Sequence, residues 1–262
     1  LLDDHFRRSG WEVRILERED WADAERIFAG AGTVIVSVPI EVTEAVIREA
    51  AAKMPADALL CDVTSVKTGP VKAMLEAHPG PVAGLHPMFG PDVTDFHAQV
   101  FVHSPGRCDS AAAPLLEQIR LWGGKIVRCT AEEHDRAMSI IQALRHFTTF
   151  AYGVFLADIR PDLHRILSLS SPIYRLELMM VGRLFAQDPH LYCDIIMSSK
   201  EKSELIGAYV ESLGPQLDIV RRGDREAFVK RFLEARAYFG ELAPIFMKES
   251  GAMLAKIQAD RR

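Results

Sequence analysis

The run TVIVSVP at residues 33–39 decides the fold, because two runs of the same kind follow it along the chain. ALLCDV at 58–63 and PVAGLHP at 81–87 are likewise short and apolar, without strict alternation of polar residues. Such runs are typical of strands buried on both faces of a mainly parallel sheet. A helix candidate, residues 41–54, separates the first two runs. Strands that alternate with helices in this way predict a doubly wound α/β domain.

Three further runs extend the predicted sheet in both directions along the chain. WEVRILE at 11–17 precedes the first run, and QVFVHS at 99–104 and KIVRC at 125–129 follow the last one. A second helix candidate covers residues 111–122. After these runs the strand signals stop, so we expect the α/β domain to occupy residues 1–129.

The remainder of the chain, residues 130–262, is predicted to be entirely helical. Thr130 and Glu133 form a capping box, in which the hydroxyl accepts from the Glu133 amide and the carboxylate reaches back. Ser-Pro and Asp-Pro pairs are typical helix starts, and they occur at 171–172 and 188–189. Further helices are expected, with a break near residues 240–244, over residues 200–220 and 225–255.

The beginning of a dinucleotide-binding domain is not represented in the chain. Such a domain opens with a strand, a G-x-G-x-x-G turn and a helix. The chain opens instead on LLDDHFRRSG at residues 1–10, which resembles the end of that helix and leads directly into residues 11–17. Loss of a central strand would leave its two neighbours with unpaired edges. We therefore expect a first strand and a glycine-rich loop to precede Leu1.

Composition and charge exclude several classes of partner. Apolar residues make up 48% of the chain and charged residues 26%, and the net charge of −5 argues against nucleic-acid binding. No apolar run approaches the roughly 18 residues of a membrane span. The cysteines lack zinc-like spacing, so we expect no metal site and reduced thiols in a cytoplasmic protein. They are Cys61, Cys108, Cys129 and Cys193.

Candidate cofactor residues lie at the carboxyl ends of the predicted strands, where such folds bind ligands. Ser37, Val38 and Pro39 end one strand in a turn that would pass beneath a dinucleotide. Glu17 ends another, and its carboxylate would bind the adenosine ribose and favour NAD over NADP. Two alternatives stay open here. Glutamate commonly ends strands without any such role, and Arg18 can bind a 2′-phosphate or stack on adenine.

His86 is the main catalytic candidate. It stands in GLHPMFGP, residues 84–91, at the carboxyl end of a buried run, and Pro87 fixes the backbone after it. An imidazole there can act as a general base near neutral pH. The alternative is a structural histidine bonded to a backbone carbonyl. Ser65, in the loop after residues 58–63, is placed to orient the ring, to contact substrate or to border the cofactor.

Candidate substrate residues lie in the helical half. Gln142 and His146, with Thr149 and Gly153, recur at helical spacing and form a polar stripe on an otherwise apolar helix. Such a stripe indicates a ligand cleft or a hydrated interface, because buried polar groups need partners.

Two arginines, Arg175 and Arg183, stand about two turns apart on the next predicted helix. A guanidinium binds a carboxylate in a planar, two-pronged arrangement, which suits an anionic ligand. For Arg183, an internal ion pair with Glu177 or with another acidic residue of the chain explains the pattern equally well.

Four phrases of the sequence resemble one known family. They are GLHPMFGP (84–91), IQALRHFTTFAYG (141–153), LSSPIYRLELMMVGRLFAQDP (169–189) and LYCDIIMSS (191–199). The chain resembles the prephenate dehydrogenases of the enterobacterial type from about residue 11 to its end. That resemblance implies a Rossmann-like NAD-binding domain followed by an all-helical dimerisation domain.

The resemblance also implies a reaction and residue roles. The reaction is the NAD-dependent oxidative decarboxylation of prephenate to 4-hydroxyphenylpyruvate, a step toward tyrosine. By motif, His86 matches the histidine that takes a hydrogen bond from the ring 4-hydroxyl, and Ser65 matches the serine beside it. Arg183 matches the arginine that binds a substrate carboxylate, His146 lines the same pocket, and Arg175 lies near.

The partners that the resemblance implies are a second copy of the chain, bound through the helical half, and a chorismate mutase domain preceding Leu1. Two rival functions remain. Arogenate dehydrogenase has the same mechanism and a substrate that differs only in its side chain. The other rival is a catalytically silent NAD-binding or dimerisation module. The joint presence of His86, Ser65 and Arg183 argues against it.

Overall fold

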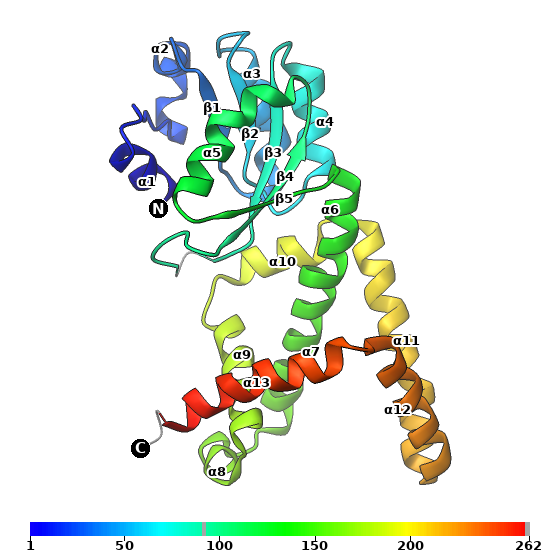
Figure 1. Ribbon diagram of the computed structural model, residues 1–262. Coiled ribbons are helices and arrows are strands. Elements are labelled where there is room, and N and C mark those ends of the chain that lie inside the picture. The colour runs from blue at the N-terminus through cyan, green and yellow to red at the C-terminus, as the bar shows by residue number, and fades with distance from the viewer. Residues whose placement is uncertain (91–92, 260–262) are drawn as a thin grey trace. The chain divides into compact units, whose positions relative to one another are not determined.

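A five-stranded sheet forms the centre of the first half of the chain, as the computed structural model in Figure 1 shows. The strand order is β1-β2-β3-β4-β5, and every neighbouring pair is parallel except β3 and β4. The predicted mainly parallel α/β sheet is therefore confirmed. The strands are β1 (Thr33–Val36), β2 (Leu59–Asp62), β3 (Val82–Pro87), β4 (Val100–Pro105) and β5 (Lys125–Arg128).

Helices cover both faces of this sheet. Alternate side chains of β1, β2 and β3 pack against α2 (Ala24–Phe28), α3 (Ile40–Ala51) and α4 (Thr68–Ala77). The intervening side chains, including Cys61 and Leu85, pack with α1 (Leu2–Arg8) and α5 (Ala113–Leu121). Both clusters are apolar because successive residues of a strand face opposite sides of the sheet. The continuous apolar runs of the sequence follow from this two-sided burial.

The prediction of a strand at residues 11–17 is wrong. This segment has no strand pairing, and the side chain of Ile15 is 51% exposed. Trp11 at its start packs on Phe6, with ring centroids 5.2 Å apart, and its indole nitrogen donates to Gln118 Oε1 at 2.9 Å. A strand needs a neighbour to complete its hydrogen-bond ladder. Among the described residues no strand pairs with this segment, so it has no regular secondary structure.

The second half of the chain is helical, as predicted. The structure describes residues 1–90 and 93–259, and residues 141–259 contain no strand. The expected caps are confirmed: Ser171 Oγ accepts from the Tyr174 amide at 3.4 Å, and Asp188 Oδ1 accepts from the His190 amide at 2.9 Å. The helices are α7 (Arg145–Ile159), α8 (Leu163–Leu169), α9 (Pro172–Phe185), α10 (Pro189–Met197), α11 (Lys200–Arg222), α12 (Arg225–Phe239) and α13 (Leu242–Ala259).

The chain divides into two compact units, Leu1–Ile140 and Ile141–Arg262, called here the first and second unit. The division falls eleven residues after the boundary at residue 129 that the sequence suggests. The reason is that α6 (Ala131–Met138), which follows the last strand, packs on α4 and β4 of the first unit. A π-helical turn, Ser139–Leu144, follows α6. No helix of the described residues is long and apolar enough to cross a membrane.

The capping box at the start of α6 is confirmed. The Glu133 amide donates to Thr130 Oγ1 at 3.1 Å, and the Thr130 amide donates to Glu133 Oε2 at 2.9 Å. Two amides that a helix start leaves without partners are thereby satisfied. This box fixes where α6 begins, and therefore which of its residues face the sheet.

Candidate functional site

Three of the candidate residues of the first unit lie at one edge of its sheet. The parallel pairing places Val36 opposite Asp62 and Asp62 opposite Gly84. Ser37 and Ser65 follow the first two of these residues, and His86 lies two residues beyond Gly84 in β3. The carboxyl ends of the three parallel strands therefore bring Ser37, Ser65 and His86 to the same edge, where α/β sheets bind ligands.

The turn from β1 into α3 is short and locally fixed. Ser37 and Pro39 are exposed, Val38 is half-buried, and Pro39 immediately precedes the helix. The buried hydroxyl of Thr43 donates to the Pro39 carbonyl at 2.9 Å, which holds the turn against the first turn of α3. The amide groups that begin α3 therefore lie at the same edge of the sheet, and such groups favour anionic ligands.

The other two cofactor candidates, Glu17 and Arg18, are exposed. Glu17 is the last residue of segment 11–17, and its amide donates to Asp20 Oδ2 at 3.2 Å at the start of a short helix, Arg18–Asp23. Both side chains are therefore accessible to a ligand. The position of Glu17 at the start of this short helix also gives it a local structural role.

His86 bonds to a second histidine that the sequence analysis did not single out. His86 Nδ1 lies 2.8 Å from Nε2 of His134, and His134 Nδ1 lies 2.8 Å from Asp135 Oδ1. The two histidines are only 3% and 1% exposed. The partner of His86 Nδ1 is thus an imidazole. The Gly84–Pro91 motif around His86 is described up to Gly90, and Pro91 lies outside the described residues.

Asp135 accepts hydrogen bonds from residues at the start of α4 in addition to the one from His134. Its Oδ1 accepts from the Lys67 amide at 2.8 Å, and its Oδ2 accepts from the Thr68 amide at 2.9 Å. Burial raises the pKa of this carboxyl, but the hydrogen bonds from His134, Thr68 and Lys67 outweigh burial and hold the pKa well below its usual value. Asp135 is therefore a carboxylate at neutral pH, and it accepts every bond that it makes.

A buried ion pair lies beneath the same edge. Asp62 and Lys67 are both fully buried, and Lys67 Nζ contacts Asp62 Oδ2. The same carboxylate oxygen accepts from the Thr64 amide at 3.0 Å and from the Thr64 hydroxyl at 2.5 Å. Gly84 leaves the space for this pair, because a Cβ there would lie 3.0 Å from Lys67 Cδ. The pair fixes the loop that carries Ser65.

The substrate candidates of the second unit lie in a π-helical turn and in two α-helices. Gln142 lies in the π-helical turn, a feature that is frequent at functional sites. His146 lies in the first turn of α7, where its ring meets Tyr192 edge-on with centroids 4.9 Å apart. Burial, with a smaller effect from the charge of Arg145, lowers the pKa of His146 to about 4. His146 is therefore neutral near pH 7, and Arg145 Nη1 donates to its Nδ1 at 3.2 Å.

The polar stripe on α7 serves partly for packing. Thr149 Oγ1 donates to the carbonyl of Arg145 at 3.0 Å, within its own helix. Gly153 lies against the Phe185 ring, and a Cβ there would collide with it. Gly153 therefore allows α7 and α9 to approach closely. The hypothesis of a ligand-facing stripe thus depends on Gln142 and His146.

Both arginine candidates lie on α9, as predicted. Arg175 is half-buried in the first turns, and Arg183 is exposed near the end of the helix. The Gln187 side chain donates to the Arg183 carbonyl at 3.0 Å, which stabilises the last turn. α9 packs on α7, and the Tyr152 and Tyr174 hydroxyls meet at 3.3 Å between the two helices.

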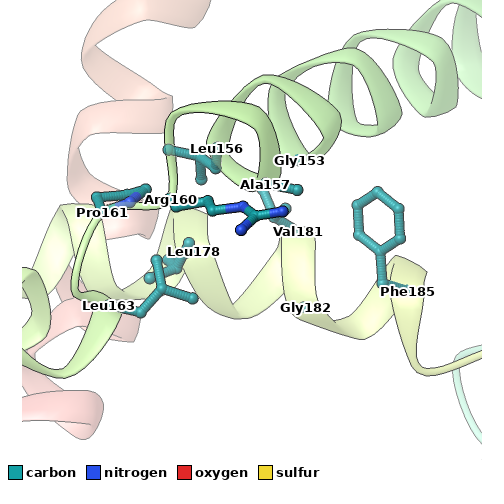
Figure 2. A pocket seen from close by; sticks show the side chains of 10 residues that line it. All are labelled: Gly153, Leu156, Ala157, Arg160, Pro161, Leu163, Leu178, Val181, Gly182 and Phe185. Atoms are coloured by element: carbon teal, nitrogen blue, oxygen red, sulfur yellow. The ribbon is translucent and has the colours of Figure 1, made fainter.

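A cavity of about 390 Å³ lies between α7 and α9, and its lining is almost entirely apolar (Figure 2). The side chain of Arg160, which follows the last residue of α7, extends along it. None of Gln142, His146, Arg175 and Arg183 lines this cavity. It is therefore not the site that the sequence predicts.

Comparison with known proteins identifies both units. Residues 15–120 match the family "Prephenate dehydrogenase, nucleotide-binding domain", and residues 130–234 match "Prephenate dehydrogenase, dimerization domain". The T-protein of Enterobacter agglomerans is 49% identical over all of this chain and 70% of its own length. The T-protein of Haemophilus influenzae is 47% identical over 97% of this chain and 67% of its own length.

One solved structure has the same fold over nearly its whole length. It is prephenate dehydrogenase from A. aeolicus in complex with hydroxyphenyl propionate and NAD+, with a TM-score of 0.73. The superposition covers 92% of this chain and 93% of that one at 18% identity. At this identity the likeness concerns the fold alone.

Proposed function

We infer the function from one premise, that the chain belongs to the prephenate dehydrogenase family. It is an NAD-dependent oxidoreductase of tyrosine biosynthesis, and it converts prephenate to 4-hydroxyphenylpyruvate with release of carbon dioxide. The observation that carries this function at the level of residues is the position of His86. A buried imidazole at the carboxyl end of β3 lies where an α/β sheet binds its ligands.

We propose the following roles for the residues of the first unit. His86 accepts the proton of the 4-hydroxyl while C4 loses its hydrogen as hydride, so that the oxygen keeps the electron pair of its O–H bond and forms a carbonyl. Ser65 orients this hydroxyl. The ring carboxylate then leaves as carbon dioxide, its bonding electrons make the ring aromatic, and His86 returns the proton to the phenol oxygen. No proton is gained or lost in sum.

The edge of the first unit suits a dinucleotide. Ser37 and Pro39 are exposed beside the start of α3, whose amide groups can bind a phosphate or ribose oxygen. We propose that Ser37, Val38, Pro39 and Ser65 border the nicotinamide half of NAD, and that Glu17 and Arg18 bind the adenosine half. When bound, NAD supplies the acceptor for the hydride.

We propose that residues of the second unit bind the two carboxylates of the substrate. Arg183 supplies a fixed positive charge, since a guanidinium does not lose its proton at neutral pH. Arg175, on the same helix, strengthens the positive field. Gln142 and the neutral His146 offer hydrogen-bonding groups that add no charge.

Replacing Arg183 by Ala is expected to raise KM for prephenate by about 10- to 100-fold, because a hydrogen bond to a charged group contributes roughly 1.5–3 kcal/mol. The value of kcat should fall much less, since the arginine binds ground state and transition state alike. Arg183→Lys should be intermediate, because it keeps the charge and loses the planar fork. Arg165→Ala, at an exposed position of α8, is the matched control. An unchanged KM in Arg183→Ala would contradict the assignment.

The assay that tests the function mixes the intact protein with NAD and prephenate and follows the absorbance of the reduced cofactor. We expect a sustained increase with prephenate. An increase with arogenate alone would mean that the same mechanism acts on arogenate instead of prephenate. Absence of any increase with either compound would support the silent-module alternative and overturn the proposal.

We propose that the chain forms a homodimer through the second unit. The description of its family match as a dimerization domain supports this. So do the large apolar side chains that α12 and α13 expose, including Phe228, Phe232 and Met247. Large apolar side chains exposed in this way are typical of protein interfaces.

Light scattering should give twice the chain mass for the native protein. The double substitution Phe228→Glu and Phe232→Glu is expected to shift the protein to the monomer mass, because it buries two charges in the interface. Leu121→Glu, at an exposed position of α5 in the first unit, is the control and should remain dimeric. A monomeric native protein, or a double variant that remains fully dimeric, would refute this interface.

A further inference from the structure

Three side chains of the first unit form one continuous hydrogen-bonded chain. His86 Nδ1 and His134 Nε2 are 2.8 Å apart, and His134 Nδ1 and Asp135 Oδ1 are also 2.8 Å apart. The strand β3 supplies the first residue and the helix α6 supplies the other two. Asp135 is anchored in turn by the amides of Lys67 and Thr68, which begin α4. Three elements of one compact unit therefore hold these three side chains in place.

The direction of each hydrogen bond follows from the carboxylate end. Asp135 is ionised, so it can only accept, and His134 Nδ1 must donate to it. In the form in which the His134 ring is neutral it carries one proton, on Nδ1, so its Nε2 holds a lone pair and accepts. His86 Nδ1 therefore donates to it and carries the ring's proton. It follows that the lone pair of neutral His86 lies on its other nitrogen, Nε2.

We propose that His134 and Asp135 are positioning residues that hold His86 in the tautomer in which Nε2 accepts the substrate hydroxyl proton. This inference rests on the proposed function, because it concerns how His86 performs its step. When the substrate O–H bond breaks, the proton forms a bond to His86 Nε2 and the ring becomes cationic. The bond from Nδ1–H to His134 is then charge-assisted and stronger than in the resting state.

The surrounding charges agree with this assignment. The buried Nζ of Lys67, in the loop before α4, is paired with Asp62. Asp135 is the carboxylate at the end of the hydrogen-bonded chain, and it faces the positive end of α4. A negative charge two groups away from His86 stabilises the imidazolium without taking its proton.

The alternative is that Asp135 only caps α4 and that His134 only fills space. A capping carboxylate does not need a buried histidine between itself and His86. Because Asp135 also holds α4, its replacement would alter stability whatever its effect on His86. The decisive substitutions are therefore at His134.

The test compares His134→Leu with His134→Gln in the intact protein. Leucine offers no acceptor to His86 Nδ1–H, whereas the glutamine side-chain oxygen can reach the position of the lost Nε2. We expect kcat to fall by about 100-fold in the leucine variant, at the lower end of what a general base contributes, with KM within about twofold. The kcat of the glutamine variant should be at least about tenfold higher than that of the leucine variant. If His134 only filled space, the two variants would not differ in this way.

A second readout needs no substrate. Proton–nitrogen correlation spectra of the protein labelled with ¹⁵N-histidine show which ring nitrogen carries the proton, and the His86 signals are identified by their loss in His86→Asn. At a pH where His86 is neutral, we expect its proton on Nδ1 in the native protein, and on Nε2 in a large fraction of the leucine variant. A native His86 with its proton on Nε2 would overturn the inference. Equal kcat values in the leucine and glutamine variants would also overturn it.

The two readouts separate this inference from the proposed function. If the protein oxidises neither prephenate nor arogenate, the proposed function fails. The spectra of the resting protein still decide whether His134 sets the tautomer of His86.

Discussion

His86→Asn is expected to lose about 10²- to 10⁴-fold in kcat with prephenate, the contribution of a positioned general base. Asparagine keeps a polar side chain of similar size, but its amide cannot take the hydroxyl proton. The KM for prephenate and for NAD should stay within about threefold, because the proton transfer occurs only in the transition state. Steady-state rates with both substrates varied measure these constants.

A second buried histidine of the first unit provides the control for this variant. His78 is 1% exposed, and its Nε2 lies 2.8 Å from the Ala58 carbonyl, away from the candidate residues. His78→Asn should lower the melting temperature and leave kcat unchanged. If His86→Asn kept more than about a tenth of the native kcat, the imidazole would not be the base.

Lys67→Met is expected to lower the free energy of unfolding by about 3–5 kcal/mol, the cost of leaving a buried charge without its partner. Lys67 and Asp62 have side chains that are 0% exposed, and Asp62 Oδ1 has no hydrogen-bond partner among the described residues. Losing Lys67 therefore leaves the carboxylate dependent on Thr64 alone. Urea unfolding measures the change.

An exposed lysine of the same region is the matched control. Lys72 on α4 has a side chain that is 74% exposed, and its Nζ lies 3.9 Å from Glu76 Oε1. Lys72→Met should change the unfolding free energy by less than about 0.5 kcal/mol, as exposed pairs usually do. The double variant Lys67→Met with Asp62→Leu should be more stable than Lys67→Met alone, because no charge is then left buried. Equal effects at Lys67 and Lys72 would show that the buried pair is not stabilising.

Much of the fold is predictable because burial leaves a strong pattern. Residues 33–39, 58–63 and 81–87 are apolar throughout since helices cover both faces of their strands, and each run contains a strand. Residues 11–17 have a strand-like sequence but no ladder, because pairing depends on a neighbour that the segment itself does not specify. The boundary of the first unit depends similarly on where α6 packs.

The candidate site was predictable only in part. His86 could be found because a histidine at the end of an apolar run is unusual. Its link to His134 spans 48 positions of the chain, and helical periodicity places His134 away from the polar stripe of α7. Only the packing of α6 beside β4 and α4 brings His134 and Asp135 to the sheet. The sequence likewise did not predict the buried Asp62–Lys67 pair, since a loop with charged residues is normally exposed to solvent.

A prephenate dehydrogenase couples hydride transfer to decarboxylation, and the stoichiometry of these two events tests this coupling most directly. Prephenate labelled with ¹³C in the ring carboxylate is incubated with NAD and the intact protein, and labelled carbon dioxide and reduced cofactor are quantified together. We predict one labelled carbon dioxide for each NADH, with 4-hydroxyphenylpyruvate as the product, and neither product above background in His86→Asn. NADH without labelled carbon dioxide, or carbon dioxide without NADH, would contradict the account.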